Sequence, residues 1–384
     1  MEGERRLCDD RRMRSTLASA DDRYDVVIVG ARVAGSALAS FLGDRGWRVL
    51  LVDRATFPSP TISTHFFRGA GLVGVLDDLG ILRQVLETGA PPLTQEFNYE
   101  TGATTGAAGP PQDPGTIGFA LSVRREPLDA LLVERAAGTP GVTVVEGAQA
   151  TAILTDGSEV VGLTVRGPDG EREVRARLVV GADGHNSTVA RLVEAPIQVD
   201  EGRVRGCFYT YVSGFPGPDG GPPDGPEFSL DDDEMAYVFP SDAGTACVAL
   251  SVTLATFAEM RGGGLDAFRD RLHHHRGLAE RFDASSPASG LLGRGPQTNL
   301  VRVPVGAGWA LVGDAGMQQD AWTGLGMDNA GVHARFLAGA IDDWFTGRAT
   351  REEAMAGFHR DRDAHALQGF EQTVSLGRDL RQLA

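Results

Sequence analysis

The sequence predicts an α/β fold in which a domain built on a parallel sheet is interrupted by a β-rich insertion and followed by helices. Three observations predict it. The stretch 24–54 reads as strand, glycine-rich turn, helix and strand. Two later apolar runs, within 178–184 and 308–316, end in Asp-Gly or Gly-Asp and have the same buried-strand character. Between them, 204–253 shows the alternating pattern of antiparallel strands instead.

Composition excludes several classes of protein. The formal net charge of the 384 residues is −16, and no basic stripe offsets it, so binding of nucleic acid through phosphates is not expected. The three cysteines, Cys8, Cys207 and Cys247, are far apart and odd in number, which favours a reducing compartment without a disulfide framework. All basic residues are arginine, which we attribute to the coding bias of a GC-rich genome.

No apolar run of 18 residues exists, so no membrane span is predicted. Residues 1–22 mix acids and bases without an apolar core, which is not the pattern of a secretory signal. We expect a disordered tail there and a cytoplasmic protein.

The first unit carries the features of a dinucleotide site. "DVVIVG" is a buried strand, "AGSALASFLGDRG" a helix of small residues, and "WRVLLVDR" a second strand that ends in Asp53. Gly30 permits a tight turn, Gly35 permits close packing of helix on strand, and the helix N-terminus attracts phosphate. Asp53 is placed to accept hydrogen bonds from ribose hydroxyls. The alternative is an ordinary α/β unit without a ligand.

Arg32 departs from this pattern. In "GARVAG" (30–35) it occupies the position where the motif usually has a glycine, which lets a pyrophosphate approach the backbone. We predict that Arg32 adopts a φ that a side chain tolerates. We also predict that its guanidinium turns toward the pyrophosphate or ribose and adds charge-assisted hydrogen bonds.

The remaining elements follow from periodicity and turn signals. They are a helix within 69–89, a helix and strand within 127–148, a β-meander leading to a buried strand over 150–184, three strands around a Gly/Pro-rich loop over 204–253, a helix pair within 264–282, a strand at 308–316 and helices from 327 onward.

With three motifs in this order, the sequence resembles the class A, aromatic-hydroxylase-type FAD-dependent monooxygenases, which are related to flavin-dependent prenyl reductases. The motifs are "GARVAG", "LVVGADGHNSTVARLV" (178–193) and "WALVGDAGMQQDAWTGLGMDNAGVHARFLAGAI" (309–341), and the resemblance covers about 24–345. It implies a Rossmann-like, glutathione-reductase-type FAD-binding domain, an inserted antiparallel substrate domain and a helical C-terminus.

The resemblance also implies where the domains begin and end. They are a tail at 1–22, an FAD-binding domain at 23–90, 120–200 and 295–345, a β-rich substrate domain at 91–119 and 201–294, and C-terminal helices at 346–384.

The resemblance also implies the residues that hold the cofactor. The turn at 30–35 would bind the FAD pyrophosphate, Asp53 the ribose, Arg125 the ribityl-phosphate region and Asp314 the ribityl chain. Asp183 and Gly184 would also serve NAD(P)H. The full set of expected cofactor-binding residues is Gly30, Arg32, Val33, Ala34, Gly35, Asp53, Arg54, Arg125, Asp183, Gly184, Gly313, Asp314, Gly324, Gly326 and Met327. Backbone of the last three would meet the pyrimidine end of the flavin, where a helix N-terminus stabilises negative charge.

Besides Arg32, two further positions depart from the family pattern. Ala190 stands where the family often has an arginine, although Arg191 follows, and Ala321 stands in place of a loop proline. These departures concern nicotinamide binding and the shape of the loop, and they leave the flavin site in place. Arg124, next to Arg125, is the less favoured candidate for the same cofactor contact, and the alternative for it is a solvated surface charge.

The expected catalytic residues are His65, Asp320 and Tyr237, with Tyr209, Tyr211 and Gln319 as further substrate-side residues. His65 is either a packing or hydrogen-bonding residue or a covalent flavin link. Asp320 is either a general base or a loop hydrogen-bond acceptor. Tyr237 lies in "AYVFP", which is either a substrate-side strand or an ordinary one.

No metal site is expected. "HHH" (273–275) lacks a carboxylate or cysteine at metal-ligand spacing and is interpreted as surface helix, and "DDDE" (231–234) as a solvated turn. The nucleophile elbow Gly-x-Ser-x-Gly is absent, as is the Trp-x-Trp-x-Ile pattern of flavin-dependent halogenases, so halogenation is disfavoured.

The function that this resemblance implies is an FAD-dependent monooxygenase. It would hydroxylate or epoxidise a small organic, aromatic or polyketide-like substrate with NAD(P)H and O₂. Two alternatives stay open: a reductase or dehydrogenase of the prenyl-reductase type, and a flavin-binding protein without turnover. The sequence leaves the oligomeric state open.

Overall fold

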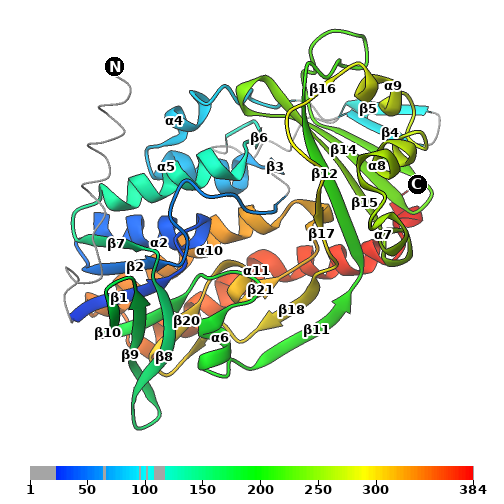
Figure 1. The fold of residues 1–384 in the computed structure, drawn as a ribbon. Helices are drawn as coiled ribbons and strands as arrows, with labels where there is room; N and C mark the ends of the chain where they lie inside the picture. The colour runs from blue at the N-terminus through cyan, green and yellow to red at the C-terminus, as the bar shows by residue number, and fades with distance from the viewer. Residues whose placement is uncertain (1–22, 64–65, 95–96, 101–102, 108–116, 384) are drawn as a thin grey trace, which may run out of the picture.

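The computed structural model describes residues 23–63, 66–94, 97–100, 103–107 and 117–383, so the tail predicted for 1–22 lies outside the described residues. Figure 1 shows a parallel sheet with its helices at one end of the molecule and a second large sheet at the other, with helix α11 running along both. The predicted α/β class is confirmed. None of the described helices is long and apolar enough to cross a membrane.

The first sheet has the order β19-β20-β10-β1-β2-β7, and β9 and β8 continue from β10 as an antiparallel meander. The pairs β20–β10, β10–β1, β1–β2 and β2–β7 are parallel. Val26 to Ile28 of β1 have no exposed surface, as expected for a parallel strand covered on both faces. The strands are β1 (Arg23–Val29), β2 (Val49–Asp53), β7 (Val142–Glu146), β8 (Gln149–Asp156), β9 (Glu159–Gly167), β10 (Gly170–Gly181), β19 (Val305–Gly306) and β20 (Trp309–Leu311).

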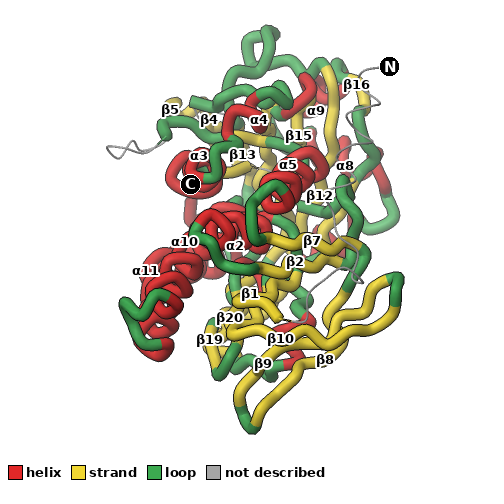
Figure 2. The backbone as a smooth tube through the Cα atoms, turned by 90° about the vertical axis from the view of Figure 1, so that its left-hand side faces the viewer, coloured by secondary structure: helices red, strands yellow, loops and turns green. Residues whose placement is uncertain are grey.

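Helices cover one face of this sheet and the meander covers the other, as Figure 2 shows from the side. The helical face carries α2 (Val33–Asp44), α5 (Arg125–Ala137) and α10 (Gly326–Phe345), which share one apolar cluster with β1 and β2. The opposite face packs on β8, β9 and the short helix α6 (Thr188–Leu192). The small residues of α2 permit its close packing on α10.

The second sheet has the order β16-β12-β15-β14-β13-β4-β5, with β17 also pairing to β12. It is antiparallel apart from the β13–β4 pair, which is parallel. Its strands are β4 (Phe97–Glu100), β5 (Ala103–Ala107), β12 (Arg205–Ser213), β13 (Glu227–Asp231), β14 (Glu234–Pro240), β15 (Thr245–Thr253), β16 (Ser286–Pro287) and β17 (Leu292–Arg294). It therefore combines strands from before and after the meander.

Alternate residues of this sheet face two different cores. Phe208 and Val238 pack under helices α7 (Leu254–Met260), α8 (Gly264–Leu272) and α9 (Leu278–Asp283) on the outer face. Tyr209 and Tyr237 belong to an inner cluster that includes Phe66 and Leu93 from the first half of the chain. The inner face is therefore the one that can border a cofactor site.

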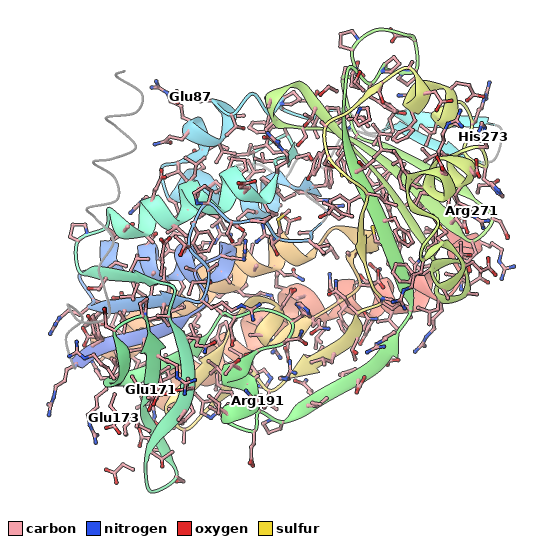
Figure 3. The ribbon with its side chains drawn as sticks, viewed as in Figure 1. Glu87, Glu171, Glu173, Arg191, Arg271 and His273 are labelled. Atoms are coloured by element: carbon pink, nitrogen blue, oxygen red, sulfur yellow. The ribbon has the colours of Figure 1, made fainter. Side chains whose placement is uncertain are left out.

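The histidine triplet is not a surface helix. α8 ends at Leu272, and the triplet occupies the turn that follows it. Figure 3 shows His273 and Arg271 at the outer surface, whereas His275 is buried with its Nδ1 3.1 Å from Ser229 Oγ. The prediction was wrong for His275 because the helix ends at Leu272, and the turn that follows directs this side chain inward to Ser229 of β13.

The remaining elements connect these layers. They are β3 (Phe66–Phe67), the π-helix η3 (Gly69–Val73), α3 (Gly74–Asp78), α4 (Leu82–Leu86), β6 (Leu121–Ser122), β11 (Ile197–Arg203), η4 (Asp242–Gly244), β18 (Thr298–Arg302), η5 (Gly313–Ala315), β21 (Met317–Gln318), η6 (Ala321–Thr323), α11 (Arg351–Gly377) and η7 (Leu380–Leu383).

Candidate flavin site and adjoining pocket

The turn between β1 and α2 requires both of its glycines. Gly30 has a φ of +104°, and a Cβ there would lie 2.4 Å from the carbonyl oxygen of Ala182. A Cβ on Gly35 would lie 1.7 Å from the carbonyl oxygen of Gly30. The two residues are thus fixed by a tight turn and by close packing, for the reasons that the sequence indicated.

Asp53 ends β2 directly beside this turn and is 8 % exposed. Its Oδ2 accepts a 2.7 Å hydrogen bond from the Ala31 amide, and its Oδ1 accepts one of 2.7 Å from the Ala55 amide. Because each carboxylate oxygen has two lone pairs, the group keeps acceptor capacity for ribose hydroxyls. Arg54, the next residue, is exposed. The ribose role of Asp53 and the cofactor role of Arg54 stay predictions.

Arg32 is the N-cap of α2 with a φ of −85°, so a side chain is accommodated without strain. Its guanidinium pairs with Asp129 of α5, a carboxylate with no exposed surface. Arg125 binds the same carboxylate at 3.0–3.1 Å. The fold thus brings two predicted cofactor residues together on an acid that sequence reasoning missed, because the pairing spans 97 positions between Arg32 and Asp129. Pyrophosphate contact by Arg32 stays a prediction.

Asp183 caps helix α6. Its Oδ1 accepts from Ser187 Oγ at 2.5 Å, and its Oδ2 accepts from the amides of Thr188 and Val189 at 2.6 and 3.2 Å. Burial raises the pKa of this carboxyl, and these hydrogen bonds oppose the rise. Gly184 follows with a φ of +79°. The NAD(P)H role of this pair stays a prediction, and Arg191 is exposed at the lower surface in Figure 3.

The start of α10 faces an open space. Gly326 is its first residue, and a Cβ there would lie 3.8 Å from Asp314 Oδ1. Apart from chain neighbours, the described residues place no other heavy atom within 4 Å of that position. Gly324 just before it has a φ of +69°, and Met327 is buried behind it. A 20-residue helix with its N-terminus open beside a carboxylate suits a flavin ring and its ribityl chain.

A buried acid, Asp328, joins this helix start to the loop opposite. Its Oδ1 accepts from the amides of Arg68 and Leu72 at 3.0 and 2.9 Å, and the Arg68 guanidinium lies 3.4 Å from its Oδ2. A Cβ on Gly71 would lie 2.2 Å from Asp328. The first turn of α10 therefore fixes the segment η3, whose backbone is kinked at Gly71. Sequence reasoning missed Asp328, although an acid directly after "GLGM" was visible.

An aromatic pocket lies between the inner face of the second sheet and the loop before α10. It is lined by Phe66, Cys207, Phe228, Tyr237, Phe239, Ala321, Trp322, Thr323 and Gly324. Phe66 and Phe239 stack with their centroids 5.0 Å apart. None of the lining residues carries a charge. Because Gly324 belongs to both regions, the pocket adjoins the space in front of α10.

Tyr237 is the predicted catalytic residue that lines this pocket. Its hydroxyl donates to the carbonyl oxygen of Trp322 at 2.8 Å. Burial raises its pKa well above the ordinary value of a tyrosine, so the group is a neutral phenol at physiological pH. Its catalytic role stays a prediction.

Asp320 forms hydrogen bonds within the protein through its carboxylate and its amide. Its Oδ1 accepts from the Trp322 amide at 3.2 Å and its Oδ2 from the Arg205 amide at 3.1 Å, while its own amide donates to Asn299 at 2.6 Å. These contacts match the loop hydrogen-bond alternative, and Asp320 does not line the pocket. Its role as a base stays a prediction.

The other residues predicted for the substrate side differ in their surroundings. Tyr209 is buried, and its hydroxyl accepts from the Ser63 amide at 3.1 Å. Tyr211 is buried on the same face of the sheet. Gln319 is buried with no hydrogen-bond partner for its amide atoms among the described residues. His65 lies outside the described residues.

Arg124 is not a solvated surface charge. Its amide donates to Oδ1 of the buried Asp242 at 2.8 Å, and its Nε donates to Oδ2 at 2.9 Å. The prediction was wrong because Asp242 is distant in sequence and lies in the loop that follows β14. The pair fastens the start of α5 to the second sheet.

Comparison with known proteins agrees with this geometry. Residues 23–210 match the FAD binding domain family. The digeranylgeranylglycerophospholipid reductase 2 of Methanothermobacter thermautotrophicus is 30 % identical over 331 residues, covering 83 % of this chain and 77 % of the reductase. The 6-methylpretetramide 4-monooxygenase of Streptomyces rimosus is 31 % identical over 172 residues, covering 45 % of this chain and 41 % of the monooxygenase.

A solved structure shares the fold. The chondrochloren halogenase CndH of a myxobacterium, an FAD-dependent halogenase, superposes with a TM-score of 0.81 at 22 % identity, covering 91 % of this chain and 82 % of that one. At this identity the likeness concerns the fold alone.

The fold and the glycine-rich turns thus define an FAD-dependent oxidoreductase. The chain belongs to the class A flavoprotein family, which includes the aromatic-hydroxylase-type monooxygenases and the related flavin-dependent prenyl reductases.

Proposed function

We propose that the protein is an FAD-dependent monooxygenase that uses NAD(P)H and O₂ to hydroxylate or epoxidise a small, uncharged, planar organic molecule. The observation that carries the proposal is the aromatic pocket that meets the start of α10 at Gly324. Phe66, Phe239 and Tyr237 present aromatic surface there, and no lining residue carries a charge, which favours a flat aromatic or polyketide-like ring system over a carboxylate or phosphate.

Bound FAD would supply hydride acceptance from NAD(P)H and oxygen transfer to the substrate. The chain's own residues bind, orient and exclude water. The Gly30 turn and Arg125 would hold the phosphates, Asp53 the ribose, and Asp314 the ribityl chain. The N-terminus of α10 favours negative charge at the pyrimidine end of the ring.

In the pocket, Tyr237 stays protonated and donates a hydrogen bond to the Trp322 carbonyl, which leaves the phenol oxygen as an acceptor for a substrate hydroxyl. Trp322 and Phe66 exclude water from the reacting face. No side-chain nucleophile is required.

The test is product analysis under labelled oxygen. Purified protein with FAD is given NAD(P)H, ¹⁸O₂ and a panel of uncharged aromatic and polyketide-like compounds. We expect substrate-stimulated NAD(P)H oxidation and a product that carries one ¹⁸O atom. Stimulated NAD(P)H consumption without label in any product would contradict the proposal. Phe239→Ala should raise KM more than it lowers kcat, since it enlarges the pocket beside the ring.

A second function has support from the comparisons. A relative that aligns over 83 % of this chain is a digeranylgeranylglycerophospholipid reductase, whereas the similarity to the 6-methylpretetramide 4-monooxygenase spans 45 %. A flavin-dependent reductase would add two hydrogen atoms to a prenyl double bond without incorporating oxygen. Anaerobic incubation of the dithionite-reduced protein with geranylgeranyl compounds distinguishes the two, because only the reductase forms a saturated product without O₂.

A further inference from the structure

The side chain of Arg32 is engaged by a segment of chain that runs along the cofactor site. The strap, which we define as residues 57–63, follows Asp53 and leads to Phe66. Arg32 Nη2 donates to Ser59 Oγ at 2.9 Å and to the Pro60 carbonyl at 3.2 Å, and its Nη1 lies 3.5 Å from the Ser59 carbonyl. The guanidinium also lies 5.3 Å from the centroid of the Phe57 ring. One arginine thus contacts three residues of the strap.

These contacts leave little capacity for a phosphate. A guanidinium has five N–H donors, four of them on the two terminal nitrogens. In Arg32 both terminal nitrogens are occupied, since Nη1 binds Asp129 and faces Ser59 O, and Nη2 binds Ser59 Oγ and Pro60 O. Bidentate recognition of a pyrophosphate would require breaking this set.

Asp129 anchors the arrangement in the fold. It is fully buried on α5 and binds Arg32 on one side and Arg125 on the other. A buried carboxylate is held in place by its charged partners, and removal of one leaves the charge uncompensated. Arg125, the predicted phosphate contact, and Arg32 are therefore oriented by the same group.

The strap spans the predicted site from end to end. It begins after Asp53, at the expected ribose, and its far end is held where the Ser63 amide donates to Tyr209 Oη at 3.1 Å. Beyond it, a Cβ on Gly324 would lie 3.7 Å from the Phe66 carbonyl oxygen, so the chain there borders the entrance to α10. Loosening the strap would open the side of the site between Asp53 and Tyr209, where FAD is predicted to bind.

We propose that Arg32 is a positioning residue that fastens the strap to Asp129 and thereby slows the release of FAD, in place of a direct ligand of the pyrophosphate. The inference concerns cofactor retention, so it goes beyond the reaction proposed above and holds for a monooxygenase or a reductase alike.

The experiment compares Arg32→Met, Ser59→Ala and the double variant, with Arg83→Met as a matched control. Arg83 is an exposed arginine of α4 that pairs with Glu87, the residue after the helix end. FAD release from the diluted holoprotein is followed by the recovery of FAD fluorescence. Mass spectrometry measures the rate of trypsin cleavage after the exposed Arg54, just before the strap. Both readouts are independent of substrate and O₂.

We expect Ser59→Ala to accelerate FAD release about tenfold, as for loss of a hydrogen bond to a charged group, and to raise cleavage after Arg54. Arg32→Met should do at least as much. In the Arg32→Met background, Ser59→Ala should add less than twofold, because its partner is already gone. Arg83→Met should match the wild type.

The proposal is overturned if Ser59→Ala leaves release and cleavage unchanged while Arg32→Met weakens equilibrium FAD binding and reduces its dependence on salt. That pattern identifies Arg32 as a direct phosphate ligand. If Arg32→Met fails to fold, Ser59→Ala alone decides between the two outcomes, since it keeps every charge beside the turn.

Discussion

At the scale of single residues, environment rather than residue type sets the chemistry. His275 is buried beside Ser229 and next to cationic neighbours, whereas His273, two positions earlier, is exposed. Burial, together with the charges of His274 and Arg271, lowers the pKa of His275 to about 4. One run of three identical residues therefore contains both exposed and buried side chains.

This predicts a loss of stability in mild acid. Between pH 6.5 and 4 the unfolded chain binds a proton at His275 and the folded chain does not, so the free energy of unfolding falls as pH falls through this range. Between pH 7 and pH 5, His275 lowers the free energy of unfolding by about 2 kcal/mol. We expect His275→Gln to remove about that much of the fall, measured by urea unfolding at both pH values.

His273→Gln serves as the control, because it changes an exposed side chain of the same triplet. It should leave the pH dependence as in the wild type. An identical effect of the two substitutions would show that burial of His275 is not the cause.

At the scale of elements, helix α10 does two things with its first turn. Gly326 leaves space beside Asp314, and Asp328 holds the amides of Arg68 and Leu72. The helix end thus both faces the expected flavin and fixes the loop opposite. A backbone N-terminus can serve a cofactor only while no side chain occupies the space in front of it.

Gly326→Val should therefore abolish this space. We expect the dissociation constant for FAD to rise at least about tenfold, because the added methyl groups displace the ring, while the free energy of unfolding of the apoprotein changes by less than about 1 kcal/mol. Titration of apoprotein with FAD measures the first, and urea unfolding the second.

Gly339→Val is the matched control, since Gly339 lies on the same helix and a Cβ there meets no heavy atom within 4 Å. It should retain the wild-type affinity for FAD. Equal affinity of the Gly326→Val variant would place the flavin elsewhere.

At the scale of the whole molecule, buried polar contacts join the second sheet to the C-terminal helix α11. Arg205 of β12 is 1 % exposed. It binds Ser251 Oγ at 2.9 Å, Asp233 Oδ1 at 2.9 Å and the carbonyl of Gly377, at the end of α11, at 3.2 Å. Such a residue connects segments more than a hundred positions apart.

Loss of this connection should be costly. Arg205→Met leaves the Asp233 carboxylate and three backbone carbonyls without their cationic partner, so we expect the free energy of unfolding to fall by about 3–5 kcal/mol. Arg378→Met, which removes an exposed pair with Glu201 near the same helix end, should cost less than about 1 kcal/mol. Urea unfolding measures the loss in the free energy of unfolding for both variants, and equal losses would contradict this prediction.

Much of the fold and part of the site could be predicted from local pattern. Strand and helix periods follow from backbone geometry, which is a property of neighbouring residues. Gly30 and Gly35 were predictable for the same reason, since a tight turn and a close helix–strand approach exclude a Cβ. The resemblance carried by the three glycine-rich motifs indicated the FAD domain, and the family match bears it out.

The partners of polar side chains could not be predicted in this way. Asp129 for Arg32, Asp242 for Arg124 and the amides capped by Asp320 are chosen by long-range packing, which brings together residues that sequence leaves apart. The same holds for the parallel β4 strand, because strand neighbours across a sheet need not be neighbours in the chain.

The sequence by itself therefore determined the class of fold and the glycine turn after β1, because each depends on spacing within a short stretch, and its resemblance to a known family indicated the FAD-binding domain. Only the tertiary structure decided what Arg32 touches. Its guanidinium reaches a buried acid on α5 and the strap at Ser59, since charged groups removed from water must find partners wherever the packed chain supplies them.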